Sequence, residues 1–103
     1  MNKLLCDVKT YLSLTADETS EDEKLNIIIE DGKQHLRQTA PDLSETDFQR
    51  STAARYLLFN FCRYAHSNAS EMFDINYKSD LLRLRLEYEV RAGVKEDEDQ
   101  NTD

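Results

Sequence analysis

Apolar residues recur along this chain with the period of α-helices, and polar segments separate one run from the next. The spacing i, i+1, i+4, i+7, i+8 predicts a first helix over residues 2–13. Its buried face would consist of Leu4, Leu5, Val8, Tyr11 and Leu12. A polar loop follows and leads to the next apolar run.

A second helix is predicted over residues 21–39. Ser20 followed by Glu23 has the spacing of a capping box, and Pro41 prevents the helix from continuing. Gly32 lies inside the apolar stripe of this helix, where it costs about 1 kcal/mol relative to alanine. We therefore expect another helix to cross closely at this glycine.

A third helix is predicted over residues 45–66, with Ser44 and Asp47 as its cap and Phe48 opening its buried face. Its segment 55–65 is apolar on nearly every side. Such a helix needs apolar partners around most of its circumference. We therefore expect part of its surface to face another protein chain.

The last ordered element has two interpretations. Residues 82–90 alternate apolar with charged side chains, which is typical of a strand, but Leu81, Leu84 and Tyr88 form a helical stripe. A lone strand would have no partner, so we favour a helix over 79–92 with Gly93 as its C-terminal cap. The short aromatic segment 72–77 before it fits one helical turn packed on the core.

These elements predict an all-α fold, a small bundle of about four helices. The ordered domain would span residues 1–94, and the charged, apolar-poor segment 95–103 would be a disordered acidic tail. Only two Gly and one Pro occur in 103 residues, which favours few, long elements. The expected core includes Leu12, Ile28, Leu58, Phe61 and Leu84.

Charge is unevenly distributed along the chain. The net charge is −8, with −6 in residues 1–49, +3 in residues 50–95 and five acids without a base in residues 96–103. An acidic total disfavours nucleic acid as the main partner, because phosphate contacts require clustered Lys and Arg. The opposite signs of the two halves suggest complementary surfaces, although solvated helix faces would give the same pattern.

Residue types that carry chemistry are present but are not arranged as known sites. Cys6, Cys62, His35 and His66 include no closely spaced pair of the kind that holds structural zinc, so we expect buried thiols, surface imidazoles and no metal. The chain has no nucleophile elbow and no Gly-rich phosphate loop, and we expect neither a cofactor nor enzyme activity. We also expect a reduced, cytosolic protein without a signal peptide or membrane span.

Three arginines on the polar side of the last predicted helix are the candidate partner-binding residues. Arg83, Arg85 and Arg91 would dock on an acidic partner surface. The alternative is that they form local salt bridges with Glu87 and Glu89.

Several stretches together resemble the small head–tail connector (adaptor, or head-completion) proteins of long-tailed bacteriophages. Residues 8–14 match a lysine–x–tyrosine–leucine helix end before an acidic loop, and residues 22–33 are similar to the family's second helix. Residues 55–65 resemble its third helix, and Phe73, Tyr77 and then residues 81–85 resemble its final element. The resemblance covers about residues 4–92 and consists of patterns of size and polarity.

The resemblance implies an oligomeric ring of this chain beneath the portal protein, at the head–tail junction of the virion. The ring would extend the DNA channel, with DNA as a non-specific passenger, and would offer a platform to the next connector or tail-completion protein. Before assembly the protein would be in the cytoplasm of the bacterial host. The alternative is an acidic helical DNA mimic that inhibits a host nucleic-acid enzyme. A transcription-related module fits less well, because Arg83 and Arg85 are followed at once by Glu87 and Glu89.

Overall fold

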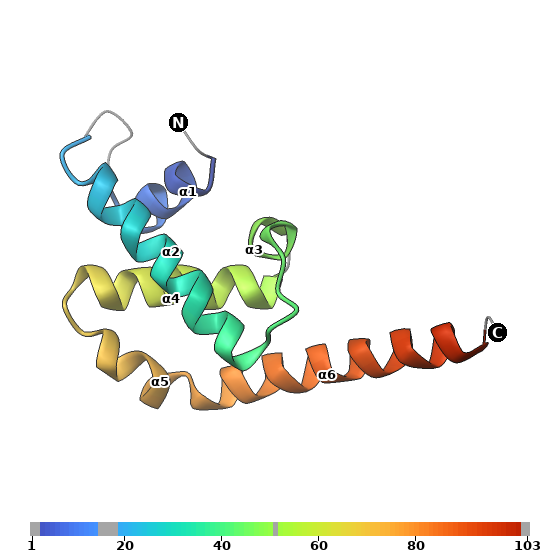
Figure 1. Ribbon diagram of the computed structural model, residues 1–103. Helices are drawn as coiled ribbons and strands as arrows, with labels where there is room; N and C mark the ends of the chain where they lie inside the picture. The colour runs from blue at the N-terminus through green and yellow to red at the C-terminus, as the bar shows by residue number, and fades with distance from the viewer. Residues whose placement is uncertain (1–2, 15–18, 51, 102–103) are drawn as a thin grey trace.

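The fold is all-α, as the sequence predicts. The computed structural model describes residues 3–14, 19–50 and 52–101, with side chains described up to residue 90 except for residue 52, and no strand occurs in these ranges. The elements, in chain order, are α1 (Lys3–Tyr11), α2 (Asp22–Thr39), α3 (Glu45–Arg50), α4 (Thr52–His66), the 3-10 turn η1 (Ser70–Met72), α5 (Phe73–Asn76) and α6 (Lys78–Asn101). Figure 1 shows α2 crossing α4, with α6 passing beneath them and extending beyond the body.

Helix α4 is the centre of the fold. Every residue from 57 to 62 is buried, and the other helices and η1 all pack against α4. The prediction that this helix needs apolar partners around its circumference is therefore confirmed. For residues 57–62 these partners come from the same chain, because α1, α2, α3, η1, α5 and α6 all pack against α4. That another part of segment 55–65 faces a second protein chain stays a prediction. Tyr56 of α4, by contrast, has 51% of its surface exposed.

The close crossing expected at Gly32 is where α2 meets α4. A Cβ atom built on Gly32 would lie 2.7 Å from Leu58 Cδ1 and 2.8 Å from Phe61 Cδ1. The neighbours are side chains of α4, and both side chains are buried. Glycine at this position therefore lets α2 and α4 approach each other closely.

One predicted helix cap is present and the other is not. Asp47 N donates to Ser44 Oγ over 3.2 Å, and Ser44 N donates to Asp47 Oδ2 over 3.0 Å, which is the predicted reciprocal box. The capping box at Ser20 is wrong, because α2 begins at Asp22 with Glu21 in the cap position and no side-chain cap hydrogen bond there. The start of α2 is fixed instead by Asp22, whose carboxylate accepts a 2.8 Å hydrogen bond from the buried Lys9.

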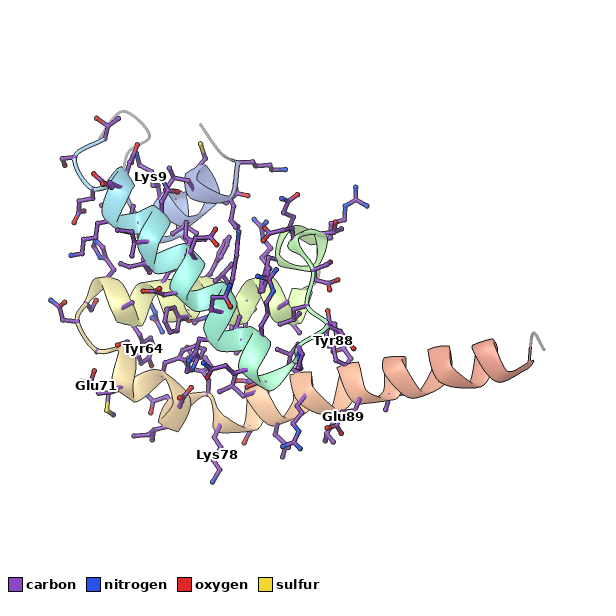
Figure 2. All side chains as sticks on the ribbon, viewed as in Figure 1. Lys9, Tyr64, Glu71, Lys78, Tyr88 and Glu89 are labelled. Carbon is purple, nitrogen blue, oxygen red and sulfur yellow. The ribbon has the colours of Figure 1, made fainter. Side chains whose placement is uncertain are left out.

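Residues 82–90 are helical, so the favoured interpretation of the alternating segment is confirmed. Leu84 and Tyr88 are 1% and 6% exposed and face the body, whereas Leu82, Leu86 and Val90 are more than half exposed. Figure 2 shows Tyr88 directed toward the body and Glu89 directed away from it. The alternation therefore arises from apolar stripes on opposite sides of one helix.

Three boundary predictions need correction. Helix α6 does not end at Gly93 but continues to Asn101, because a single glycine costs only about 1 kcal/mol and no proline follows it. The predicted disorder of residues 95–103 is accordingly not confirmed, and residues 102–103 lie outside the described part. The count of about four helices is too low: the described residues form six α-helices and one 3-10 turn. Segment 45–66 contains two helices, and residues 72–76 belong to η1 and α5.

Four of the five residues chosen for the core are buried. Ile28, Leu58, Phe61 and Leu84 are buried, but Leu12 is only partly buried against the core. The reason is that α1 ends at Tyr11 and the chain turns at Ser13, where φ is 64°.

Candidate interaction surfaces

Two of the three predicted docking arginines lie on the part of α6 that faces solvent. Arg83 and Arg85 are both exposed. Arg85 Nε donates to Glu89 Oε1 over 3.0 Å, and both side chains are about 60% exposed, so the local salt bridge that the sequence allowed does form. The side chain of Arg91 lies outside the described residues. A docking role for these arginines stays a prediction.

An exposed apolar stripe accompanies these arginines, and the sequence reasoning did not identify it. Leu82, Leu86 and Val90 are 54%, 51% and 66% exposed and follow one another at intervals of four residues. Residues four apart lie on the same face of a helix. The stripe runs along the side of α6 opposite Leu84 and Tyr88, toward the end of the helix that leaves the body in Figure 1.

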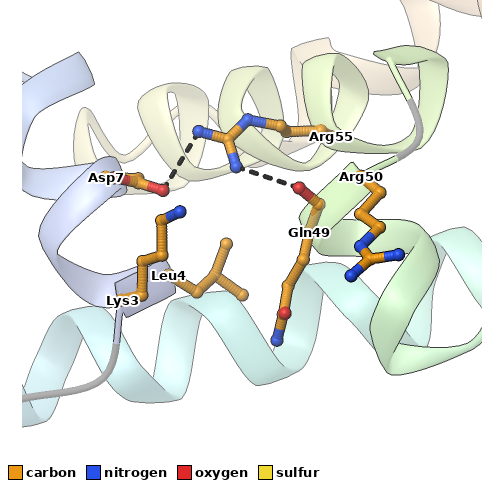
Figure 3. A pocket seen from close by; sticks show the side chains of 6 residues that line it. All are labelled: Lys3, Leu4, Asp7, Gln49, Arg50 and Arg55. Atoms are coloured by element: carbon orange, nitrogen blue, oxygen red, sulfur yellow. Dashed lines mark hydrogen bonds and ion pairs between the residues drawn. The ribbon is translucent and has the colours of Figure 1, made fainter.

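A positively charged cavity of about 180 Å³ lies between α1, α3 and α4 (Figure 3). Its lining residues are Lys3, Leu4, Asp7, Gln49, Arg50 and Arg55. Arg55 Nη2 donates to Asp7 Oδ2 over 3.1 Å and Arg55 Nη1 donates to the Gln49 carbonyl over 3.4 Å, so this guanidinium ties α1 to α3. The cavity therefore combines three basic side chains with one acid, and its chemistry suits a carboxylate or another small anion.

Many carboxylates of the acidic half serve as internal ion-pair partners. Lys9 is 1% exposed and pairs with Asp22 at 2.8 Å. Lys33 is 4% exposed and donates to Glu45 over 2.8 Å and to Glu30 over 3.1 Å. Burial lowers the pKa of Lys33, but the two carboxylates outweigh it and raise that pKa above its ordinary value. The hydrogen bond from Lys33 lowers the pKa of Glu45, and it outweighs the partial burial of Glu45, which acts in the opposite direction.

A buried polar centre sits inside the apolar part of α4. Asn60 is 2% exposed, and its Nδ2 donates to the Tyr56 carbonyl over 2.8 Å. Its Oδ1 accepts hydrogen bonds from Tyr11 Oη at 3.0 Å and Tyr77 Oη at 2.8 Å. This amide thereby joins α1, α4 and the α5–α6 junction. The sequence signal for it was a single polar residue within an apolar run.

The thiols and imidazoles are not assembled into a site. Cys62 is fully buried, and burial raises its pKa to about 12, while Cys6 is partly exposed. The expectation of surface imidazoles is wrong: both are partly buried, with His35 Nε2 2.6 Å from Asp74 Oδ1 and His66 Nε2 3.3 Å from Glu21 Oε2. Within the described ranges, no three His, Cys, Asp or Glu side chains gather where they could hold a metal ion.

No protein-family model, curated protein or solved structure matches this chain at a significant level. None of the helices in the described part of the chain is long and apolar enough to cross a membrane.

Proposed function

We propose that this protein is a non-enzymatic head–tail connector of a long-tailed bacteriophage, which forms a ring beneath the portal protein and presents a platform to the next connector or tail-completion protein. The observation that carries the proposal is α6. It extends past the body and exposes Leu82, Leu86 and Val90 next to Arg83 and Arg85. Apolar side chains rimmed by charges, on a projecting element, are typical of protein-interaction surfaces.

A ring needs two different patches on each copy, because its contacts are heterologous. The projecting face of α6 would be one of them. The cavity formed by Lys3, Arg50 and Arg55 would be the other, and it would receive acidic side chains of a neighbouring protein. The net charge of −8 supports the channel role, since a predominantly acidic protein lets DNA pass without forming phosphate contacts.

The DNA-mimic alternative is less well supported. A mimic needs a continuous surface of carboxylates that are available to a partner. Here Asp7, Asp22, Glu45, Asp74 and Glu89 each lie within ion-pair distance of a basic side chain of the same chain. These acids therefore stabilise the fold or neutralise nearby cations.

The test uses a phage in which this gene is deleted. Without the protein, DNA-filled heads and complete tails should accumulate separately, and electron microscopy would show them unjoined. The variant Arg83→Glu/Arg85→Glu should lower the yield of joined particles, because both residues lie on the proposed docking face. The matched control is Lys24→Glu/Asn26→Asp/Gln34→Glu, which makes the same total charge change at three exposed positions of α2. Joined particles at normal yield after deletion would exclude the connector function.

A further inference from the structure

The outer face of α6 has the composition of a helix-pairing seam. Leu82, Leu86 and Val90 line it, and the same helix already uses its opposite face, Leu84 and Tyr88, to pack on the body. Each residue advances about 100° around a helix, so steps of four residues keep the outer side chains within a narrow band. The band is apolar, exposed and straight enough for a second helix to lie along it.

Charged residues flank this band in the same order on its two sides. The helical spacing puts Arg83 and Glu87 on one flank, and Arg85 and Glu89 on the other. Each flank therefore carries one base followed, four residues later, by one acid. Flanking charges of this kind determine which orientation two paired helices adopt.

The charge order selects one orientation when α6 lies against a copy of itself. In an antiparallel pair with its two-fold axis at Leu86, Arg83 faces Glu87 of the second copy, and Arg85 faces Glu89 of the second copy. Leu86 then meets its own equivalent, and Leu82 meets Val90 of the second copy. In a parallel pair, by contrast, Arg83 approaches Arg85 of the second copy and the glutamates approach each other. Like charges at such positions repel.

We infer that α6 of the free protein pairs antiparallel with α6 of a second copy through Leu82, Leu86 and Val90. The contact uses the same patch on both copies, so it closes at two chains and cannot grow into a filament or a ring. The internal pair between Arg85 and Glu89 is no obstacle, because both side chains are about 60% exposed and surface ion pairs are exchanged at little cost. The inference goes beyond the connector function and does not depend on it. A pair of this kind covers the face proposed for docking until assembly releases it.

The first experiment measures the mass of the purified full-length protein by sedimentation equilibrium over a range of concentrations. The wild-type chain should approach the mass of two copies as concentration rises. Leu86→Asp should weaken the pairing by at least about tenfold, because it buries two carboxylates against each other at the axis. Ile27→Asp is the matched control: Ile27 is 58% exposed but lies on α2, so this variant should pair like the wild type. A wild type that stays at the mass of one copy, or a Leu86→Asp variant that pairs normally, overturns the inference.

The second experiment exchanges the charges. Arg83→Glu/Arg85→Glu makes both flanks acidic, and Glu87→Arg/Glu89→Arg makes both flanks basic. Each variant alone should have the mass of one copy, and an equimolar mixture should recover the mass of two. Circular dichroism of each variant establishes that the helices are intact. A mixture that does not pair, although both variants are folded, contradicts the role of these charges.

The third experiment determines the orientation by disulfide formation in a Cys6→Ser background, in which Cys62 stays buried. An antiparallel pair predicts that Leu82→Cys and Val90→Cys crosslink when the two variants are mixed, and that neither crosslinks efficiently alone. A parallel pair predicts that each variant crosslinks with itself and that the two variants do not crosslink with each other. That result would overturn the inference. These assays use purified protein only. Their failure leaves the deletion test of the connector function unaffected, and failure of that test leaves the pairing intact.

Discussion

Replacing Gly32 by alanine tests the helix crossing on which the core depends. The added Cβ atom would lie 2.7 Å from Leu58 Cδ1 and 2.8 Å from Phe61 Cδ1. Leu58 is fully buried and Phe61 is 8% exposed, so neither side chain has open space into which it could move. Either α2 and α4 separate slightly, or both side chains leave their preferred rotamers.

Two opposing effects set the magnitude. Alanine favours the helix over glycine by about 1 kcal/mol. Overpacking a well-packed core costs about 1–3 kcal/mol. We therefore expect Gly32→Ala to lower the free energy of unfolding by about 1 kcal/mol, up to a limit of about 2. For a domain of this size, each kcal/mol lowers the thermal midpoint by roughly 4–8 °C.

Urea unfolding followed by circular dichroism measures the change. Gln34→Ala, at an exposed position of the same helix, is the control and should shift stability by no more than about 0.5 kcal/mol. In a Leu58→Ala background the Gly32→Ala substitution should cost less, because one of the two clashing atoms is gone. A Gly32→Ala variant that is more stable than the wild type by about 1 kcal/mol would refute the reasoning. It would mean that helix propensity acts alone and that α4 does not crowd Gly32.

Three further outcomes are expected. Phe61→Ala should lower the free energy of unfolding by about 3–5 kcal/mol in the same urea assay, and a loss below about 1 kcal/mol would place Phe61 outside the core. When the native protein is treated with iodoacetamide at neutral pH, Cys6 should be alkylated long before Cys62, because burial raises the pKa of Cys62 to about 12. Equal alkylation rates of the two thiols, measured by mass spectrometry, would contradict the burial of Cys62. Lys33 lowers the pKa of Glu45, so the stability that this pair contributes is present at neutral pH and is lost as the pH falls below 4.5, the ordinary pKa of a glutamate. When the free energy of unfolding is measured at decreasing pH, the Lys33→Met variant should therefore lose less stability below pH 4.5 than the wild type.

The helices could be predicted from the sequence because their signals are local. Apolar residues at helical spacing, the cap at Ser44 and Asp47, and the good helix formers of residues 82–90 are all short-range features. The close approach at Gly32 was also predictable, since a glycine in an apolar helix stripe has a cost that packing can offset. The helix boundaries near Leu12 and Gly93 could not be predicted, because the position of a helix end there depends on small free-energy differences between competing turns.

The long-range polar contacts could not be predicted, because each of them joins residues far apart in the chain. The buried Lys9 donates its hydrogen bond to Asp22, thirteen positions later. Asn60 is satisfied by tyrosines forty-nine and seventeen positions away. The burial of α4 by its own chain has the same origin: the sequence indicated that the helix needs partners, but which elements supply them is a property of the tertiary fold.

Locating the protein in finished phage particles tests the connector function most directly. Gold-labelled antibody against this chain should mark a single position, the junction between head and tail, in electron micrographs of intact or partly disrupted particles. Particles that carry no label, together with recovery of the protein from infected cells in complex with a host nucleic-acid enzyme, would contradict the connector function and favour the DNA mimic.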